Sequence, residues 1–187
     1  MALGINDVDV DGFKDLDRKV RENPALGKRT VKVRSTWQRG VKGLVEVGLQ
    51  ENQGKAVTPR TRRFFVTMDA PAGLGGVDAA ATAVESVVAA FAGCLTTGIA
   101  TNASLFDIPI DALEVDMEAD IDLRGLLGHD KSVRSGFTDI RYTVTVQSSA
   151  SEEQLRKCKE TIDRKSPVGD TLRNPVNVTS RFVFKPR

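Results

Sequence analysis

The stretch from residue 69 to residue 106 constrains the fold of this chain more than any other. A proline and three glycines within residues 71–76 break regular structure, and the longest run with helical spacing of apolar residues follows them. Thr82 precedes the first apolar residue of that run and can cap a helix. Charged side chains are almost absent from residues 86–106, so no face of the helix is plainly suited to water. We therefore predict a tight turn that leads into a buried central helix, with Cys94 in its middle.

The same stretch carries motifs that resemble a known family. They are Asp69-Ala-Pro, Leu74-Gly-Gly-Val-Asp78, and Ala92-Gly-Cys-Leu-Thr-Thr97, in which Cys94 follows Glu85 by nine residues. Together they resemble the signature of the osmotically inducible protein C and organic hydroperoxide resistance superfamily (OsmC/Ohr). A second segment, Lys165-Ser-Pro-Val-Gly-Asp-Thr-Leu172, resembles the Cys-Pro-Val segment of that family, with Ser166 at the cysteine position. The resemblance covers about residues 31–185.

Composition argues against several other classes of protein. Of the 187 residues, 28% are charged and 40% are hydrophobic, which is typical of a soluble one-domain protein. The formal net charge of +2 is spread along the chain without a basic, aromatic-rich patch, so we expect no nucleic-acid partner. Polar residues interrupt the central helix, and the N-terminus is acidic, unlike a secretion signal. We expect a cytoplasmic protein that does not enter a membrane.

Cysteine and histidine usage gives no metal-ligand spacing. Cys94 and Cys158 belong to no CxxC pair, and His129 is the only histidine, in a loop where we expect it to be solvated. We therefore predict no metal and no bound cofactor.

The periodicity of the remaining chain predicts an α+β fold with antiparallel sheets and two main helices. A short amphipathic helix is expected over 12–22. Strands are expected over 30–37, 43–49 and 63–69 before the central helix, and over 113–123, 137–147 and 176–184 after it, with a second main helix over 151–165 that Ser151 caps and Pro167 ends. We divide the chain into an N-terminal helical arm, 1–28, and an OsmC-like domain, 29–187.

The resemblance implies an intertwined homodimer, with both central helices buried between the sheets and each site built from two subunits. In the peroxidase members, a cysteine on the central helix attacks the peroxide as a thiolate, and a second cysteine condenses with the resulting sulfenic acid. An arginine and a glutamate stabilise and orient the thiolate. Carried onto this chain, Cys94 is the first cysteine and Ser166 stands at the second, where a hydroxyl cannot form a disulfide.

The other site candidates depart from the family pattern or have alternatives. Cys158 lies about 12 Å along a helix from Ser166, and we expect it to face the core rather than Cys94. The family glutamate position holds Val84. Glu85 lies about 180° around the helix from Cys94, so it is expected to serve the first helical turn or to pair across the dimer.

For the arginine there are two matches, Arg39 and Arg63, of which we favour Arg39. Taken alone, each fits a solvated surface arginine better than a thiolate partner, because arginine is common at strand ends.

These residues leave three hypotheses. The first is a thiol-dependent, one-cysteine organic hydroperoxide reductase with Cys94 as nucleophile and an external thiol as reductant. The alternative is a non-peroxidase OsmC-like protein that binds a small apolar ligand at the dimer interface, which would explain Val84 and Ser166 together. The third is a purely structural dimer with a buried thiol.

Overall fold

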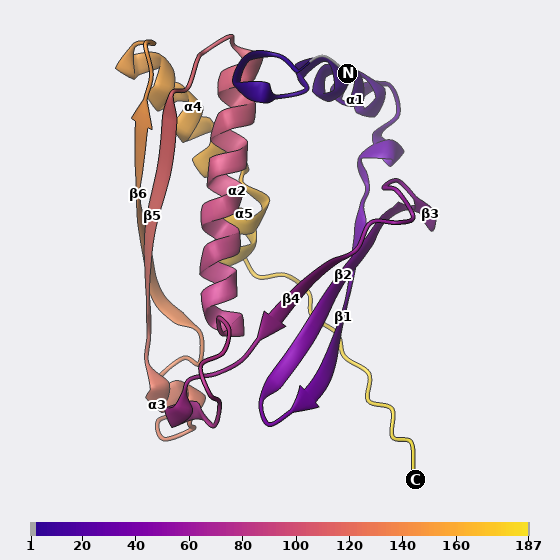
Figure 1. Cartoon of the computed structure of the whole chain (residues 1–187), viewed down its shortest axis with the longest axis vertical. Helices are drawn as coiled ribbons and strands as arrows, with labels where there is room; N and C mark the ends of the chain where they lie inside the picture. Colours follow the sequence, from indigo (N-terminus) through magenta and orange to yellow (C-terminus); the bar gives the residue numbers. More distant parts are fainter. Residues whose placement is uncertain (1–2, 187) are drawn as a thin grey trace.

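The computed structural model describes residues 3–186, and Figure 1 shows its α+β architecture. The strands are β1 (Thr30–Arg39), β2 (Lys42–Asn52), β3 (Lys55–Ala56), β4 (Phe64–Met68), β5 (Ala112–Ile121) and β6 (Phe137–Gln147). The helices are α1 (Val10–Glu22), α2 (Ala83–Leu105), α3 (Leu123–Leu126), α4 (Glu152–Lys165) and α5 (Pro167–Arg173), with 3-10 turns at Ile5–Asp7, Pro24–Gly27 and Ala72–Leu74. The two antiparallel sheets and the two main helices that the sequence predicted, α2 and α4, are confirmed.

The strands form two separate antiparallel sheets. In the first, β2 lies between β1 and β4 and also pairs with the short β3. In the second, β5 and β6 pair along their whole length. Apolar and acidic residues alternate along β5, so its acidic side chains lie on the exposed face, where Arg141 pairs with Glu118 and Asp120.

The central helix α2 stands between these two sheets in Figure 1. One stripe of it is buried, with Phe91, Leu95, Ile99 and Ala103 at four-residue spacing. Helices α4 and α5 and strand β5 pack against α2, and Gly98 allows the close approach of α4: a Cβ there would lie 2.8 Å from Cγ2 of Ile162. The core of a single chain is therefore built around α2.

Much of the chain is uncovered in the single copy. Both faces of the β1–β4 sheet are largely open, and Trp37, Phe64 and Phe65 are exposed. Among residues 3–186, α2 is the one helix long and apolar enough to span a membrane by length and composition, a test that the core helix of a soluble protein also passes. Only 17% of its most apolar 18-residue window is buried.

The N-terminal arm is fastened to the end of α2. The side chain of Asn6 donates to Oγ of Ser104 at 3.0 Å and to the carbonyl of Ile108 at 2.9 Å, and it accepts from the amide of Ile110 at 2.8 Å. The arm's helix was predicted from its apolar spacing and is confirmed as α1, which starts two residues earlier.

One prediction about the C-terminal part is wrong. Residues 176–184 form no strand: the segment runs away from the body in Figure 1, and Val178 and Phe182 are 82% and 88% exposed. A strand needs a neighbouring backbone to pair with, and one chain offers this segment none. Pro167 ends α4 but also begins α5, because its fixed φ suits the first helical position.

Candidate functional site

The position of Cys94 is set by where helix α2 begins. Thr82 and Glu85 form a capping box at the start of α2: the Thr82 hydroxyl accepts from the Glu85 amide at 3.0 Å, and the Glu85 carboxylate accepts from the Thr82 amide at 2.7 Å. Cys94 follows three turns later, next to the buried Leu95. Its thiol is free and half-buried, so it lies at the edge of the core rather than inside it.

The turn before α2 is held by a buried carboxylate. Asp69 is 6% exposed and accepts from the amide of Ala79 at 3.0 Å. Backbone amides, first that of Ala79 and then that of Ala70, hold the pKa of Asp69 below its ordinary value. Gly76 packs on Ala70 so closely that a Cβ would overlap the Ala70 carbonyl oxygen. The family-like Asp-Ala-Pro and Gly-Gly motifs are thus one structural unit that aims the chain into α2.

Ser166 is brought to Cys94 by the junction of α4 and α5. Its amide donates to the carbonyl of Ile162 at 2.8 Å and so closes α4, while its hydroxyl accepts from the amide of Gly169 at 3.1 Å and so opens α5. The same hydroxyl donates to Sγ of Cys94 at 3.2 Å. Ser166 is 2% exposed, so this contact is made away from solvent. A donated hydrogen bond stabilises negative charge on its acceptor, here the sulfur.

Gly169 lets α5 dock against α2. A Cβ on this buried residue would lie 2.9 Å from Cε2 of Phe91, 3.2 Å from Oγ of Ser166 and 2.8 Å from Nη1 of Arg173. A larger residue would push α5, and with it the hydroxyl of Ser166, away from Cys94. The sequence analysis did not single out Gly169 or Arg173. The only local indication of this close packing in the sequence is the Gly-Asp pair that follows Pro-Val.

The two arginine candidates lie elsewhere in the single chain. Arg39, at the end of β1, lines a cavity of about 420 Å³ together with Lys42, Asp69 and Gly76. Arg63 pairs with Glu46 at 3.4 Å on the neighbouring sheet. Among the described residues, Ser166 is the one side chain that hydrogen-bonds the sulfur of Cys94. The choice between the two arginines as thiolate partner stays a prediction.

Glu85 and Cys158 lie where the sequence analysis expected them. The carboxylate of Glu85 bonds Thr82 rather than approaching Cys94, and the backbone amide of Thr82 lowers its pKa. Cys158 is 2% exposed and packs in a core cluster with Ala103 and Ile108. Burial raises the pKa of its thiol, which disfavours the reactive thiolate form. It forms no disulfide with Cys94.

No group of three or more His, Cys, Asp or Glu within residues 3–186 is arranged to hold a metal ion. His129 is exposed in the loop between β5 and β6. The two groups that the structure brings together at this site are the free thiol of Cys94 and the buried hydroxyl of Ser166.

Comparison with known proteins identifies the family. The family model for OsmC-like proteins matches residues 75–181, which is more than half of the chain and includes both Cys94 and Ser166. The chain belongs to the OsmC-like protein family. No curated protein matches it.

Solved structures show the same fold at low sequence identity. An OsmC-like protein from Mycoplasma pneumoniae has a TM-score of 0.59 and 12% identity, covering 78% of this chain and 89% of that chain. An OsmC-like protein from Vibrio cholerae has a TM-score of 0.53 and 12% identity, covering 76% of this chain and 92% of that chain. An organic hydroperoxide resistance protein from Elizabethkingia anophelis has a TM-score of 0.52 and 17% identity, covering 78% of this chain and 89% of that chain.

Proposed function

We propose that this protein is a thiol-dependent organic hydroperoxide reductase of the one-cysteine type, with Cys94 as its nucleophile. The observation that carries the proposal is the buried hydrogen bond from Ser166 to the sulfur of Cys94, at 3.2 Å. It places a donor at the atom that must carry negative charge in order to attack a peroxide. Membership of a family whose fold is shared by an organic hydroperoxide resistance protein supports the same reaction class.

The proposed cycle uses one protein sulfur and two external thiols. The thiolate of Cys94 attacks one oxygen of the hydroperoxide, so that an S–O bond forms while the O–O bond breaks, and the leaving alkoxide takes a proton to become an alcohol. An external thiol then condenses with the sulfenic acid, and water leaves as a mixed disulfide forms. A second thiol attacks that disulfide, which regenerates Cys94 and releases the oxidised reductant.

Within one chain, no second cysteine is placed to react with the sulfenic acid of Cys94. Ser166, which contacts Cys94, carries a hydroxyl and cannot form a disulfide. Cys158 is buried in the separate cluster with Ala103 and Ile108. The reductant must therefore come from solution, and the proposal needs no metal or cofactor.

We further propose that the working form is a homodimer. The chain exposes 13858 Å² of surface, whereas a compact monomer of 20.3 kDa exposes about 8,800 Å². The excess comes from the open β1–β4 sheet, the apolar exposed stripe of α2 and the extended C-terminal segment, and it exceeds the roughly 1,000–2,500 Å² that each subunit buries in many obligate dimers. A second copy could also bring Arg39 or Arg63 to Cys94, which a single chain does not.

The dimer is tested by a charge on the exposed stripe of α2. Val87→Arg should convert the wild-type dimer to monomer or aggregate in sedimentation velocity, because a guanidinium would be buried without a partner. Glu160→Arg, on the solvent side of α4, should leave the dimer intact. A monomeric wild type at micromolar concentration would contradict the dimer.

The activity is tested by the oxidation rate of Cys94. The second-order rate constant with cumene hydroperoxide should exceed that with hydrogen peroxide, and mass spectrometry should place one added oxygen on Cys94 in wild type and in Cys158→Ser. Cys94→Ser should show none. A rate no faster than that of free cysteine would overturn the peroxidase proposal and favour the alternative, a protein that binds a small apolar ligand.

A further inference from the structure

A cavity of about 250 Å³ is lined by Gly169, whose amide bonds the hydroxyl of Ser166, and the rest of its lining is mixed in character. Phe91 and Phe137 supply aromatic walls, Arg134 and Arg173 supply two positive charges, and Asp139 supplies one negative charge. The ionisable groups of the lining sum to +1. A pocket with apolar walls and a net single positive charge is suited to a small organic monoanion.

Arg173 is held in place by contacts that leave its charge uncompensated. Its Nη1 donates to the carbonyl of Asp163 at 3.0 Å, and its guanidinium lies over the ring of Phe91, 5.9 Å from the centroid. Within residues 3–186 neither Arg173 nor Arg134 belongs to an ion pair. Apart from the bond of Arg173 to the Asp163 carbonyl, the donors of the two guanidinium groups are available to bind an anion.

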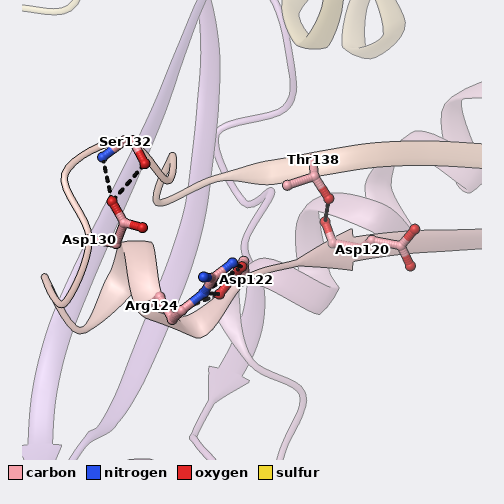
Figure 2. A network of polar contacts seen from close by, with 6 residues as sticks. All are labelled: Asp120, Asp122, Arg124, Asp130, Ser132 and Thr138. Carbon is pink, nitrogen blue, oxygen red and sulfur yellow. Dashed lines mark hydrogen bonds and ion pairs between the residues drawn. The ribbon is translucent and has the colours of Figure 1, made fainter.

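Arg134 is placed by the ordered loop between β5 and β6. Gly125 packs on the backbone of Arg134 so closely that a Cβ would overlap its carbonyl oxygen, and Oγ of Ser135 donates to the Gly125 carbonyl at 3.0 Å. Figure 2 shows the polar contacts at this end of the hairpin: Asp122 with Arg124, Asp130 with Ser132, and Thr138 with the carbonyl of Asp120. This loop thus places Arg134 in the lining of the cavity, to which α5 also contributes.

Gly169 links the cavity to the reactive sulfur through Ser166. Gly169 lines the cavity, and its amide donates to Oγ of Ser166, which in turn contacts Sγ of Cys94. A Cβ on Gly169 would lie 2.8 Å from Nη1 of Arg173 and 3.2 Å from Oγ of Ser166, so these two atoms flank the same side of Gly169. Phe91 lies one helical turn before Cys94 on α2. The guanidinium that would hold an anionic group is therefore close to the hydroxyl that contacts the sulfur.

We propose that this cavity binds the carboxylate of the external reductant, a small thiol that carries one negative charge close to its sulfur. The inference rests on the proposed one-cysteine cycle, in which the missing second sulfur must arrive from solution. Arg173 and Arg134 hold the carboxylate, and the aromatic walls cover the short carbon chain. The bound thiol attacks the sulfenic acid of Cys94: the S–S bond forms, the S–O bond breaks, and the hydroxyl leaves as water with the proton of the thiol.

The test compares two thiols of equal length. Cys94 is converted to its sulfenic acid in Cys158→Ser protein and mixed with 3-mercaptopropionate or with uncharged 3-mercaptopropan-1-ol, and the mixed disulfide at Cys94 is timed by quenching and mass spectrometry. The carboxylate thiol should react at least about tenfold faster, since a charge-assisted bidentate contact is worth about 1.5–3 kcal/mol. The advantage should shrink as salt is raised.

Variants assign the effect to the cavity. Arg173→Gln and Arg134→Gln should each remove most of the preference for the carboxylate thiol, while Arg173→Lys should retain part of it. Arg164→Gln, an exposed arginine of α4 outside the cavity, should leave the preference unchanged. If Arg173→Gln does not fold, Arg134→Gln still decides the question.

Failure of this inference is separable from failure of the peroxidase proposal. The sulfenic acid can be formed with excess hydrogen peroxide even if organic hydroperoxides react slowly. Equal rates for the two thiols in wild type, or a preference that survives both glutamine substitutions, would overturn the reductant site and leave the oxidation of Cys94 as it stands.

Discussion

Replacing Ser166 by cysteine should give the site a disulfide that the natural chain cannot form. The hydroxyl oxygen of Ser166 lies 3.2 Å from the sulfur of Cys94, and a disulfide requires about 2.05 Å. A thiol sulfur sits farther from its Cβ than a hydroxyl oxygen does, so part of the remaining gap of roughly 1 Å closes without backbone movement. Peroxide oxidation of Cys94 should then be followed by condensation with the new thiol.

The size of the effect follows from the loop that the bond would close. Residues 94 and 166 are 72 positions apart, and closing a loop of that length removes about 4 kcal/mol of chain entropy from the unfolded state. Any strain at the junction of α4 and α5 reduces this figure. The oxidised variant should therefore be more stable than its dithiothreitol-reduced form by about 2–4 kcal/mol.

The assay uses the double variant Ser166→Cys, Cys158→Ser. One equivalent of cumene hydroperoxide should remove both thiols and two mass units, whereas Cys158→Ser alone should gain one oxygen. Urea unfolding of oxidised and reduced protein, at equal protomer concentration, gives the free-energy difference. A persistent sulfenic acid beside an intact second thiol would refute the placement of Ser166 against Cys94.

Three further predictions test the supporting structure. Gly98→Val should lower the free energy of unfolding by about 2 kcal/mol in urea titrations, because its side chain would press on Ile162. Glu85→Ala should destabilise the protein more at pH 7 than at acidic pH: the pKa of Glu85 is held below its usual 4.5, so its stabilising effect is present above that value and is lost as the pH falls through the folded-state pKa. Cys158→Ala should cost roughly 1 kcal/mol in thermal unfolding and leave the oxidation rate of Cys94 unchanged.

Local features of the fold could be predicted from the sequence because their causes are local. Thr82 and Ser151 were expected to cap helices, and each forms a capping box with the residue three positions later. The alternation along β5 defined its buried and acidic faces. The segment 176–184 also alternates, yet it forms no strand, because pairing requires a second backbone that the pattern does not encode.

The candidate site was predictable only in part. Cys94 and Ser166 were matched through motifs, and the structure brings them into contact. The cavity with Arg134 and Arg173 was missed, because its residues come from α2, β6, α5 and a loop, and they meet only through close packing at Gly125 and Gly169. A glycine in the sequence is weak evidence for such close packing, because the sequence does not tell which glycines another segment packs against.

The hydrogen bonds at Ser166 have one further consequence. The amide of Gly169 donates to the hydroxyl of Ser166, and that hydroxyl donates to the sulfur of Cys94, so the three groups form a polarised relay that ends on sulfur. A change in the charge or oxidation state of the sulfur therefore alters the hydrogen bond that the amide of Gly169 donates to Ser166. In a nitrogen–proton correlation spectrum, where glycine amides stand apart, the Gly169 resonance should therefore shift with the state of Cys94 and report each step of its redox cycle without a label on the thiol.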